Sequence, residues 1–212
     1  MQTISEILKR TNICPSDGPH PIICAPAPEV ARGLARHYTA QVLGRGGSVD
    51  SDAAIAPIET AARWLTEPGK PWLFLSGNCG TGKTTLLRAI HKTLVERGVP
   101  AWAFCASDFS SLFLNNAENT DRKLLRGEFC RVLLLDDIGV DQDEIKFYGN
   151  IIRPFVKIVE SRYNARLPMV VSTNLSGAEM RETYGERTID RIREMAAAIR
   201  YEGKSFRKSS TN

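Results

Sequence analysis

The feature that most constrains this chain is a glycine-rich segment, 77–84, which reads Gly-Asn-Cys-Gly-Thr-Gly-Lys-Thr. An apolar run from Trp72 to Ser76 precedes it, and a segment with helical periodicity follows it from Lys83 to Arg97. Glycines at the first and sixth positions let the backbone curl until its N–H groups converge on one point. The lysine adds a positive charge, and the following helix adds the positive end of its dipole. The pattern predicts a phosphate-binding loop of the Walker A type.

The residues of this loop have separate expected roles toward ATP and Mg²⁺. Lys83 is expected to place its charge against the β- and γ-phosphates, and Thr84 to offer its hydroxyl to Mg²⁺. Cys79 is interpreted as a tolerated small residue, and the alternative is a thiol that can be modified when nucleotide is absent. The candidate nucleotide-binding residues are Gly77, Asn78, Cys79, Gly80, Thr81, Gly82, Lys83, Thr84 and Thr85.

Acidic residues follow a second apolar run, 132–135, in the manner of a Walker B motif. Asp136 and Asp137 would lie at the carboxyl end of a buried strand, which is where α/β sheets bind ligands. We expect Asp136 to hold Mg²⁺ and Asp137 to orient or deprotonate the attacking water. The alternative is that Asp136 only caps a turn, and the Walker A loop upstream argues against it.

A third polar cluster ends the apolar run at Val170 and Val171 with Ser172, Thr173 and Asn174. An asparagine after a strand is usually a turn residue. Beside two Walker motifs, Asn174 is also a candidate to hydrogen-bond the γ-phosphate or the attacking water.

Strand-like and helix-like segments alternate around these motifs, which is typical of a parallel sheet with helices on both faces. We predict a three-layer α/β/α fold with a five-stranded parallel sheet. A long helix is expected over 145–163, with a kink at Pro154. The expected strands are 72–76, 101–106, 132–135, 169–172 and 196–201.

The first 50 residues are expected to form an N-terminal segment, and 51–212 the ATPase domain. Residues 1–10 have the periodicity of an amphipathic helix, and the prolines of 14–28 predict an extended arm. Helices are expected over 29–43 and 55–66. The apolar side of the first helix either docks a partner protein or packs on its own domain.

Composition excludes some classes of protein. No apolar run approaches the about 20 residues that span a bilayer, and the N-terminus lacks the layout of a secretion signal. We therefore expect a cytoplasmic protein without a membrane contact. The net charge of +4 permits nucleic-acid binding without requiring it, and 181–208 is the most basic stretch. The five cysteines include no C-x₂-C pair, so isolated thiols are expected rather than a zinc site.

Taken in order, these segments resemble the AAA+ ATPases, and within them the DnaC/IstB group of bacterial helicase loaders and transposition ATPases. The resemblance runs from about Ile55 to Arg207, and Asp136-Asp137-Ile138-Gly139 and Gly203-Lys204-Ser205-Phe206-Arg207 are the pieces that favour this group. The other matching pieces are 80–84, Ser172-Thr173-Asn174, and Tyr184 to Arg187 with Asp190-Arg191.

The resemblance implies roles for further residues. Asn174 matches the family's sensor residue. Arg191 matches the arginine finger that reaches a neighbouring subunit's γ-phosphate, with Arg187 as the alternative. This implies a homo-oligomer when ATP or DNA is bound. Helices between Ser107 and Arg126 resemble an insertion that lies near single-stranded DNA, with Lys123 and Arg126 as candidate phosphate contacts.

The function that the resemblance implies first is ATP-dependent loading of a replicative DNA helicase, with single-stranded DNA as a partner. One alternative is a transposition regulator that binds duplex DNA and a transposase. Another is a nucleotide-gated adaptor with little hydrolysis, because Asp137 stands where many AAA+ proteins have a longer glutamate. Five residues follow Arg207, so no C-terminal helical lid is expected.

Overall fold

The structure is a computed structural model. The residues that it describes are 21–49, 51–108, 130–139, 145–147 and 150–202. The central sheet has five strands, all parallel, in the order β2-β3-β6-β1-β7. These strands are β1 (Trp72–Gly77), β2 (Ala101–Cys105), β3 (Val132–Ile138), β6 (Met169–Thr173) and β7 (Ala196–Tyr201). The prediction of a five-stranded parallel sheet is confirmed.

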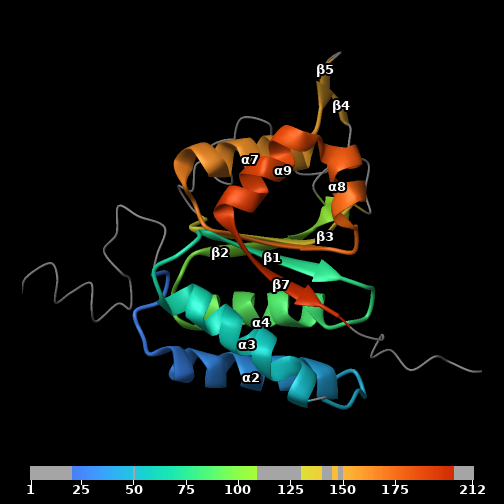
Figure 1. The fold of residues 1–212 in the computed structure, drawn as a ribbon. Coiled ribbons are helices and arrows are strands. Elements are labelled where there is room, and N and C mark those ends of the chain that lie inside the picture. The colour runs from blue at the N-terminus through green and yellow to red at the C-terminus, as the bar shows by residue number, and fades with distance from the viewer. Residues whose placement is uncertain (1–20, 50, 109–129, 140–144, 148–149, 203–212) are drawn as a thin grey trace, which may run out of the picture.

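Helices cover both faces of this sheet, as Figure 1 shows. One face carries α2 (Ala27–Leu43), α3 (Ser51–Thr66) and α4 (Lys83–Glu96), and the other carries α7 (Pro154–Ala165), α8 (Gly177–Tyr184) and α9 (Glu186–Met195). Successive strand side chains point to opposite faces. Leu73 and Leu75 accordingly join the core on the α4 side, whereas Trp72 joins the core on the α7 side. The three-layer α/β/α architecture is confirmed.

The described part of the N-terminal segment packs on the layer that contains α4. Val30 and Leu34 of α2 are buried in the same core cluster as residues of α3 and α4. The backbone N–H groups of Ile22 and Ile23 both donate to the carbonyl oxygen of Leu65 at 2.9 Å. α2 begins two residues earlier than predicted, because Pro28 in its first turn needs no hydrogen-bond acceptor. The expected helix at 1–10 lies outside the described residues.

The long helix predicted over 145–163 is wrong in its first half. Residues before α7 form two short strands, β4 (Ile145–Phe147) and β5 (Asn150–Ile152), which pair antiparallel and project from the top of Figure 1. The helix begins only at Pro154. Arg153 is extended, with φ −104° and ψ 97°, because the proline ring disfavours the helical conformation of the residue before it. A proline is tolerated as the first helical residue, where its missing N–H has no partner to lose.

Other expectations concern residues that the structure does not describe. The helices expected over 109–126 and the segment from Gly203 to Arg207, including the question of a lid, belong to these. Among the described cysteines, Cys79, Cys105 and Cys130 are free thiols. Cys24 is disulfide-bonded, so the expectation of isolated thiols is wrong for it. Spacing could not reveal this, because a disulfide depends on the distance between folded Cα atoms.

A buried arginine joins the ends of three elements at the edge opposite the candidate site. Arg162 of α7 is fully buried. Its Nη1 donates to the carbonyl oxygens of Arg131 at 3.0 Å and Pro168 at 3.2 Å, and its Nη2 donates to that of Cys130 at 3.1 Å. These carbonyls precede β3 and β6, so one guanidinium donates to backbone acceptors of both strands where they begin.

We predict that Arg162→Met lowers the free energy of unfolding by about 3 kcal/mol, because the buried carbonyl groups lose the donors of the guanidinium. Thermal and urea denaturation followed by circular dichroism measure the loss. Arg63→Met, at an exposed position of α3, is the matched control and should leave stability within about 0.5 kcal/mol of wild type. Equal stability of the two variants would contradict the structural role of Arg162.

Candidate nucleotide-binding site

The glycine-rich loop connects β1 to α4, and its three glycines, Gly77, Gly80 and Gly82, all have a positive φ that other residues rarely adopt. Gly77 has φ 139° and Gly82 has φ 100°. A Cβ atom on Gly77 would stand 2.3 Å from the carbonyl oxygen of Tyr201, and one on Gly82 would stand 2.5 Å from the hydroxyl of Tyr38. The loop therefore needs glycine at both positions, for conformation and for space.

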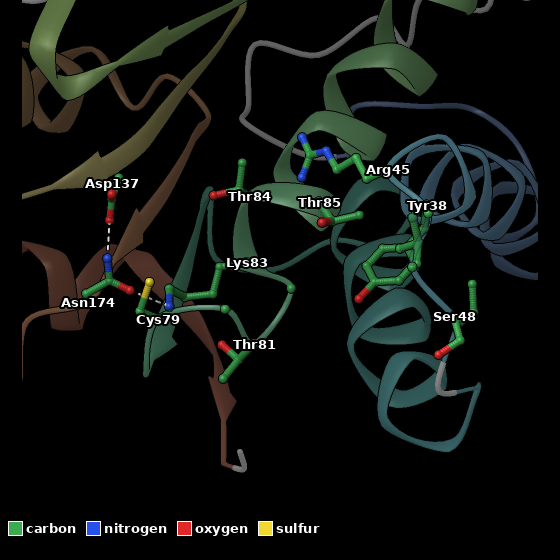
Figure 2. A pocket seen from close by; sticks show the side chains of 16 residues that line it. Tyr38, Arg45, Ser48, Cys79, Thr81, Lys83, Thr84, Thr85, Asp137 and Asn174 are labelled. Carbon is green, nitrogen blue, oxygen red and sulfur yellow. Dashed lines mark hydrogen bonds between the residues drawn. The ribbon is translucent and has the colours of Figure 1, made fainter. Parts of the chain in front are cut away.

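A cavity of about 380 Å³ opens above this loop (Figure 2). Most of the predicted site residues line it. These are Cys79, Gly80, Thr81, Gly82, Lys83, Thr84, Thr85, Asp137 and Asn174. Gly77 and Asn78 supply backbone at the base of the loop, and Asp136 lies behind Thr84. Residues from β1, β3, β6 and α4 thus come together at the carboxyl edge of the sheet, as the sequence predicts.

Lys83 lies at the centre of the site and is almost fully buried. Its ammonium group donates to the carbonyl oxygen of Gly77 at 2.6 Å, to that of Asn78 at 2.7 Å and to Asn174 Oδ1 at 2.7 Å. A lysine ammonium has three donors, so this environment uses all of them. Burial lowers the pKa of Lys83, and the negative charge of Asp137 opposes that shift. A phosphate oxygen would have to compete with these oxygen acceptors for the lysine.

Asp136 and Thr84 form a pair of oxygen ligands of the kind that Mg²⁺ prefers. The Thr84 hydroxyl donates to Asp136 Oδ1 at 3.1 Å, and Ser172 donates to the same oxygen at 2.7 Å. A hydroxyl and a carboxylate beside a phosphate cradle fit a magnesium ion that completes its shell with phosphate and water. Among the described residues, no cluster of three or more His, Cys, Asp or Glu side chains suits a metal held by protein alone. The donor set therefore fits a metal that arrives with a nucleotide.

Asp137 and Asn174 are hydrogen-bonded to each other and both line the cavity. The Asn174 Nδ2 donates a short hydrogen bond to Asp137 Oδ1, while its Oδ1 accepts from Lys83. Figure 2 shows Asn174 between the other two side chains. Asp137 has a left-handed backbone conformation, with φ 60°, which is uncommon outside glycine. Lysine, asparagine and aspartate thus form a continuous polar chain from the phosphate loop to the second acidic residue.

Arg191 does not join this group and does not line the cavity. It lies on α9, where its Nη1 is 2.9 Å from Glu160 Oε1 and its guanidinium stands 5.0 Å from the ring centre of Tyr163. Only 14% of its side chain is exposed. The side chain of Arg187, one turn earlier, is 80% exposed and its Nη2 is 3.9 Å from the same carboxylate oxygen.

Sequence reasoning missed one wall of the cavity. Tyr38 and Val42 of α2 line it, together with Arg45, Ser48 and their neighbours in the loop over 44–49. The sequence offers these residues no motif, and the glycines of this loop suggest only a flexible break. Their part in the site depends on how α2 packs against α4, a contact between segments more than 40 residues apart. Along the lining, the positive charges of Arg45 and Lys83 exceed the negative charge of Asp137, which suits a polyanion.

Comparison with known proteins relates this site to replication proteins. The chain is 34% identical over 122 residues to the replicative helicase loader DnaC of Escherichia coli (strain K12), in an alignment that covers 56% of this chain and 48% of the relative. The chain spans about half the length of the curated relatives it matches. No family model matches the sequence.

Solved structures show the same fold. A crystal structure of the DnaC helicase loader superposes with a TM-score of 0.57 at 21% identity, over 71% of this chain and 90% of that one. AMPPCP-bound DnaA from Aquifex aeolicus superposes with a TM-score of 0.56 at 20% identity, over 73% and 48%. The shared fold is a parallel sheet with helices on both faces. In sequence this chain is therefore similar to a replicative helicase loader, and in fold it is similar to the DnaC helicase loader and to DnaA.

Proposed function

We propose that this chain binds and hydrolyses Mg²⁺-ATP and acts in DNA replication as a helicase-loader-like ATPase. One observation carries the proposal: Lys83, Thr84, Asp137 and Asn174, from three separate segments, line one cavity at the carboxyl edge of the sheet, and Asp136 accepts a hydrogen bond from Thr84 behind it. Folding alone does not require these side chains to lie together. All five together supply what phosphoryl transfer to water requires.

Each residue has a part that its contacts support. Thr84 and Asp136 would hold Mg²⁺, which when bound neutralises charge on the phosphate oxygens. Lys83 would turn from the carbonyls of its own loop to the β- and γ-phosphates. That exchange releases Asn174, which is then free to orient a water molecule toward the terminal phosphate. Asp137 lies within hydrogen-bond reach of Asn174 and would accept the proton of that water.

The wall formed by α2 would receive the nucleoside. Tyr38 and Val42 supply the apolar contacts, beside the start of α4. An aromatic ring with an adjacent aliphatic side chain suits a purine base, because it offers both stacking and apolar area. The phosphate chain would then run from this wall across the loop toward Asp137.

The proposal of a helicase partner and of DNA rests on the relatives. The E. coli protein that shares 34% identity is named a replicative helicase loader. We propose a replicative helicase as the partner of this chain and single-stranded DNA as the nucleic acid on which it acts. Within the described residues, no helix is long and apolar enough to cross a membrane.

We also propose that the nucleotide lies between two copies of the chain, with an arginine of α9 reaching the neighbour's phosphates. The contacts favour Arg187 for this role over Arg191. Arg191 is held by Glu160 and Tyr163 of its own chain, whereas Arg187 is largely exposed. A side chain that must reach another subunit needs the second environment.

The first prediction concerns hydrolysis. We expect wild-type protein to release phosphate from Mg²⁺-ATP, faster with a single-stranded oligonucleotide than with its duplex. Lys83→Ala should lower the rate at least about 100-fold, because it removes the charge that faces the transferred phosphate. Phosphate release is measured under single-turnover conditions, where slow turnover is still visible. If the wild-type protein binds nucleotide but releases no phosphate with DNA and a replicative helicase present, the proposed hydrolysis is contradicted. The alternative that then remains is a nucleotide-gated adaptor.

The second prediction concerns the subunit interface. Arg187→Ala should abolish DNA-stimulated hydrolysis, with little change in nucleotide affinity. Mixing it with Lys83→Ala should restore part of the rate, because some mixed interfaces contain both an intact loop and an intact arginine. Arg193→Ala, exposed on the same helix, is the matched control and should hydrolyse as wild type does. A loss with Arg191→Ala alone would restore Arg191 as the finger, and no loss with either arginine would place the whole site within one chain.

The third prediction concerns the nucleoside wall. Tyr38→Ala should weaken Mg²⁺-ATP binding about tenfold, the scale of one lost aromatic contact. Binding of inorganic tripolyphosphate, which has no nucleoside, should stay unchanged. Tyr38→Phe keeps the ring and should keep the affinity for ATP. Competition against a fluorescent nucleotide measures these affinities. An equal loss of affinity for ATP and for tripolyphosphate in Tyr38→Ala would contradict the assignment of this wall.

A further inference from the structure

Ser172 is a buried residue that contacts both acidic residues of the site and belongs to neither motif. It lies on β6 and is 1% exposed. Its hydroxyl donates to Asp136 Oδ1 at 2.7 Å and accepts from the backbone N–H of Asp137 at 2.8 Å. A serine hydroxyl has one hydrogen to donate, so the bond to Asp136 fixes its direction and leaves a lone pair for the N–H.

The pairing of β3 with β6 is irregular at this serine. Leu135 pairs with Val171 and Ile138 pairs with Thr173, so Asp136 and Asp137 of β3 together lie opposite Ser172 alone. Two residues against one is the definition of a β-bulge. The left-handed conformation of Asp137, with φ 60°, accommodates that extra residue in the backbone. The Ser172 side chain accepts from the backbone N–H of Asp137 within this irregular stretch of the ladder.

The bulge explains how both carboxylates reach one site. In a regular strand, successive side chains point to opposite faces of the sheet. Here Asp136 accepts from Thr84 and Asp137 lines the cavity that Thr84 also lines, so the two consecutive side chains serve the same side. The extra residue makes this geometry available, and the hydroxyl of Ser172 is bonded at the point where the chain turns.

We propose that Ser172 is a positioning residue that holds Asp136 toward the metal and Asp137 toward the reacting water through this bulge. The inference rests on the proposed function, because it concerns the metal and the water of that reaction. Ser172 itself contacts the two aspartates and acts through them. Removing its hydroxyl should therefore disturb the metal-dependent steps and spare the phosphate loop, which is built from β1 and α4.

The test is Ser172→Ala. Affinity for a fluorescent ADP in EDTA should stay within twofold of wild type, because this binding does not involve a metal. The Mg²⁺ concentration that half-saturates the nucleotide-bound protein should rise about tenfold, as for partners that orient metal ligands. The single-turnover rate at saturating Mg²⁺ should fall about 100-fold through the displaced Asp137. Ser172→Thr, which keeps the hydroxyl, should recover most of both losses.

Controls separate this effect from a loss of structure. Thr93→Val is the matched variant, because among the described residues its buried hydroxyl has no hydrogen-bond partner. It should change neither Mg²⁺ dependence nor rate. Should Ser172→Ala not fold, Ser172→Cys fills the same space with a weaker donor and is expected to raise the half-saturating Mg²⁺ concentration at least fivefold.

The outcomes distinguish the inference from the proposed function. A Ser172→Ala or Ser172→Cys variant with wild-type Mg²⁺ half-saturation overturns the role of Ser172 and leaves ATP hydrolysis untouched. A wild-type protein that binds Mg²⁺-ADP without hydrolysing ATP defeats the proposed activity, while the Mg²⁺ titration still tests Ser172. Loss of metal-free nucleotide binding in Ser172→Ala, with normal melting, also counts against the inference, because it means that the serine supports the loop and not the acids.

Discussion

The site depends on one placement, that of β6 between β1 and β3 in the parallel sheet. β1 leads into the phosphate loop, β3 carries the two aspartates near its end, and β6 carries Ser172 near its end and is followed by Asn174. Because all three run in the same direction, their carboxyl ends meet at one edge. The central strand then contacts both neighbours: Asn174 bonds Lys83 on one side and Asp137 on the other, and Ser172 bonds both aspartates. Any shift of β6 by one register position would separate all of these pairs at once.

The polar groups of this edge bond one another, and that sets the energetics of nucleotide binding. Lys83 donates to two loop carbonyls and to Asn174, so a bound phosphate would replace these neutral acceptors with a charged one. Binding is then an exchange, whose gain is the difference between the two sets of bonds. Asn174 is the residue whose hydrogen-bond partners would change when a phosphate binds, because it bonds both Lys83 and the proposed base, Asp137. In the proposed function, binding at the loop would in this way change the hydrogen bonds of Asp137.

Sequence reasoning predicted the parts of this site that depend on local pattern and missed those that depend on register or packing. β3 and β6 were predictable because strands buried on both faces are continuous apolar runs. Lys83, Asp137 and Asn174 were predictable as site residues because each follows such a run. The bulge at Asp137 was not, since it exists only in the pairing of β3 with β6. Pro154 was expected to kink a helix, but it starts one, because competing strand pairing between β4 and β5 takes the residues before it.

The wall that sequence reasoning missed also ties the N-terminal segment to the chemistry. Nε2 of His37, next to Tyr38 on α2, lies 2.8 Å from Glu96 Oε2 at the end of α4, and Arg36 lies at the same distance from that oxygen. The hydrogen bond from His37 lowers the pKa of Glu96. A carboxyl group with a lowered pKa stabilises the fold above its unfolded pKa, and this contribution disappears as pH falls through the folded value. Since α4 begins with Lys83, the helix that carries the phosphate-loop lysine at one end holds α2 at the other. A partner that moves α2 would thus change the proposed nucleoside wall and its contact with the start of α4, where Gln41 donates to the carbonyl oxygen of Thr85 at 3.3 Å.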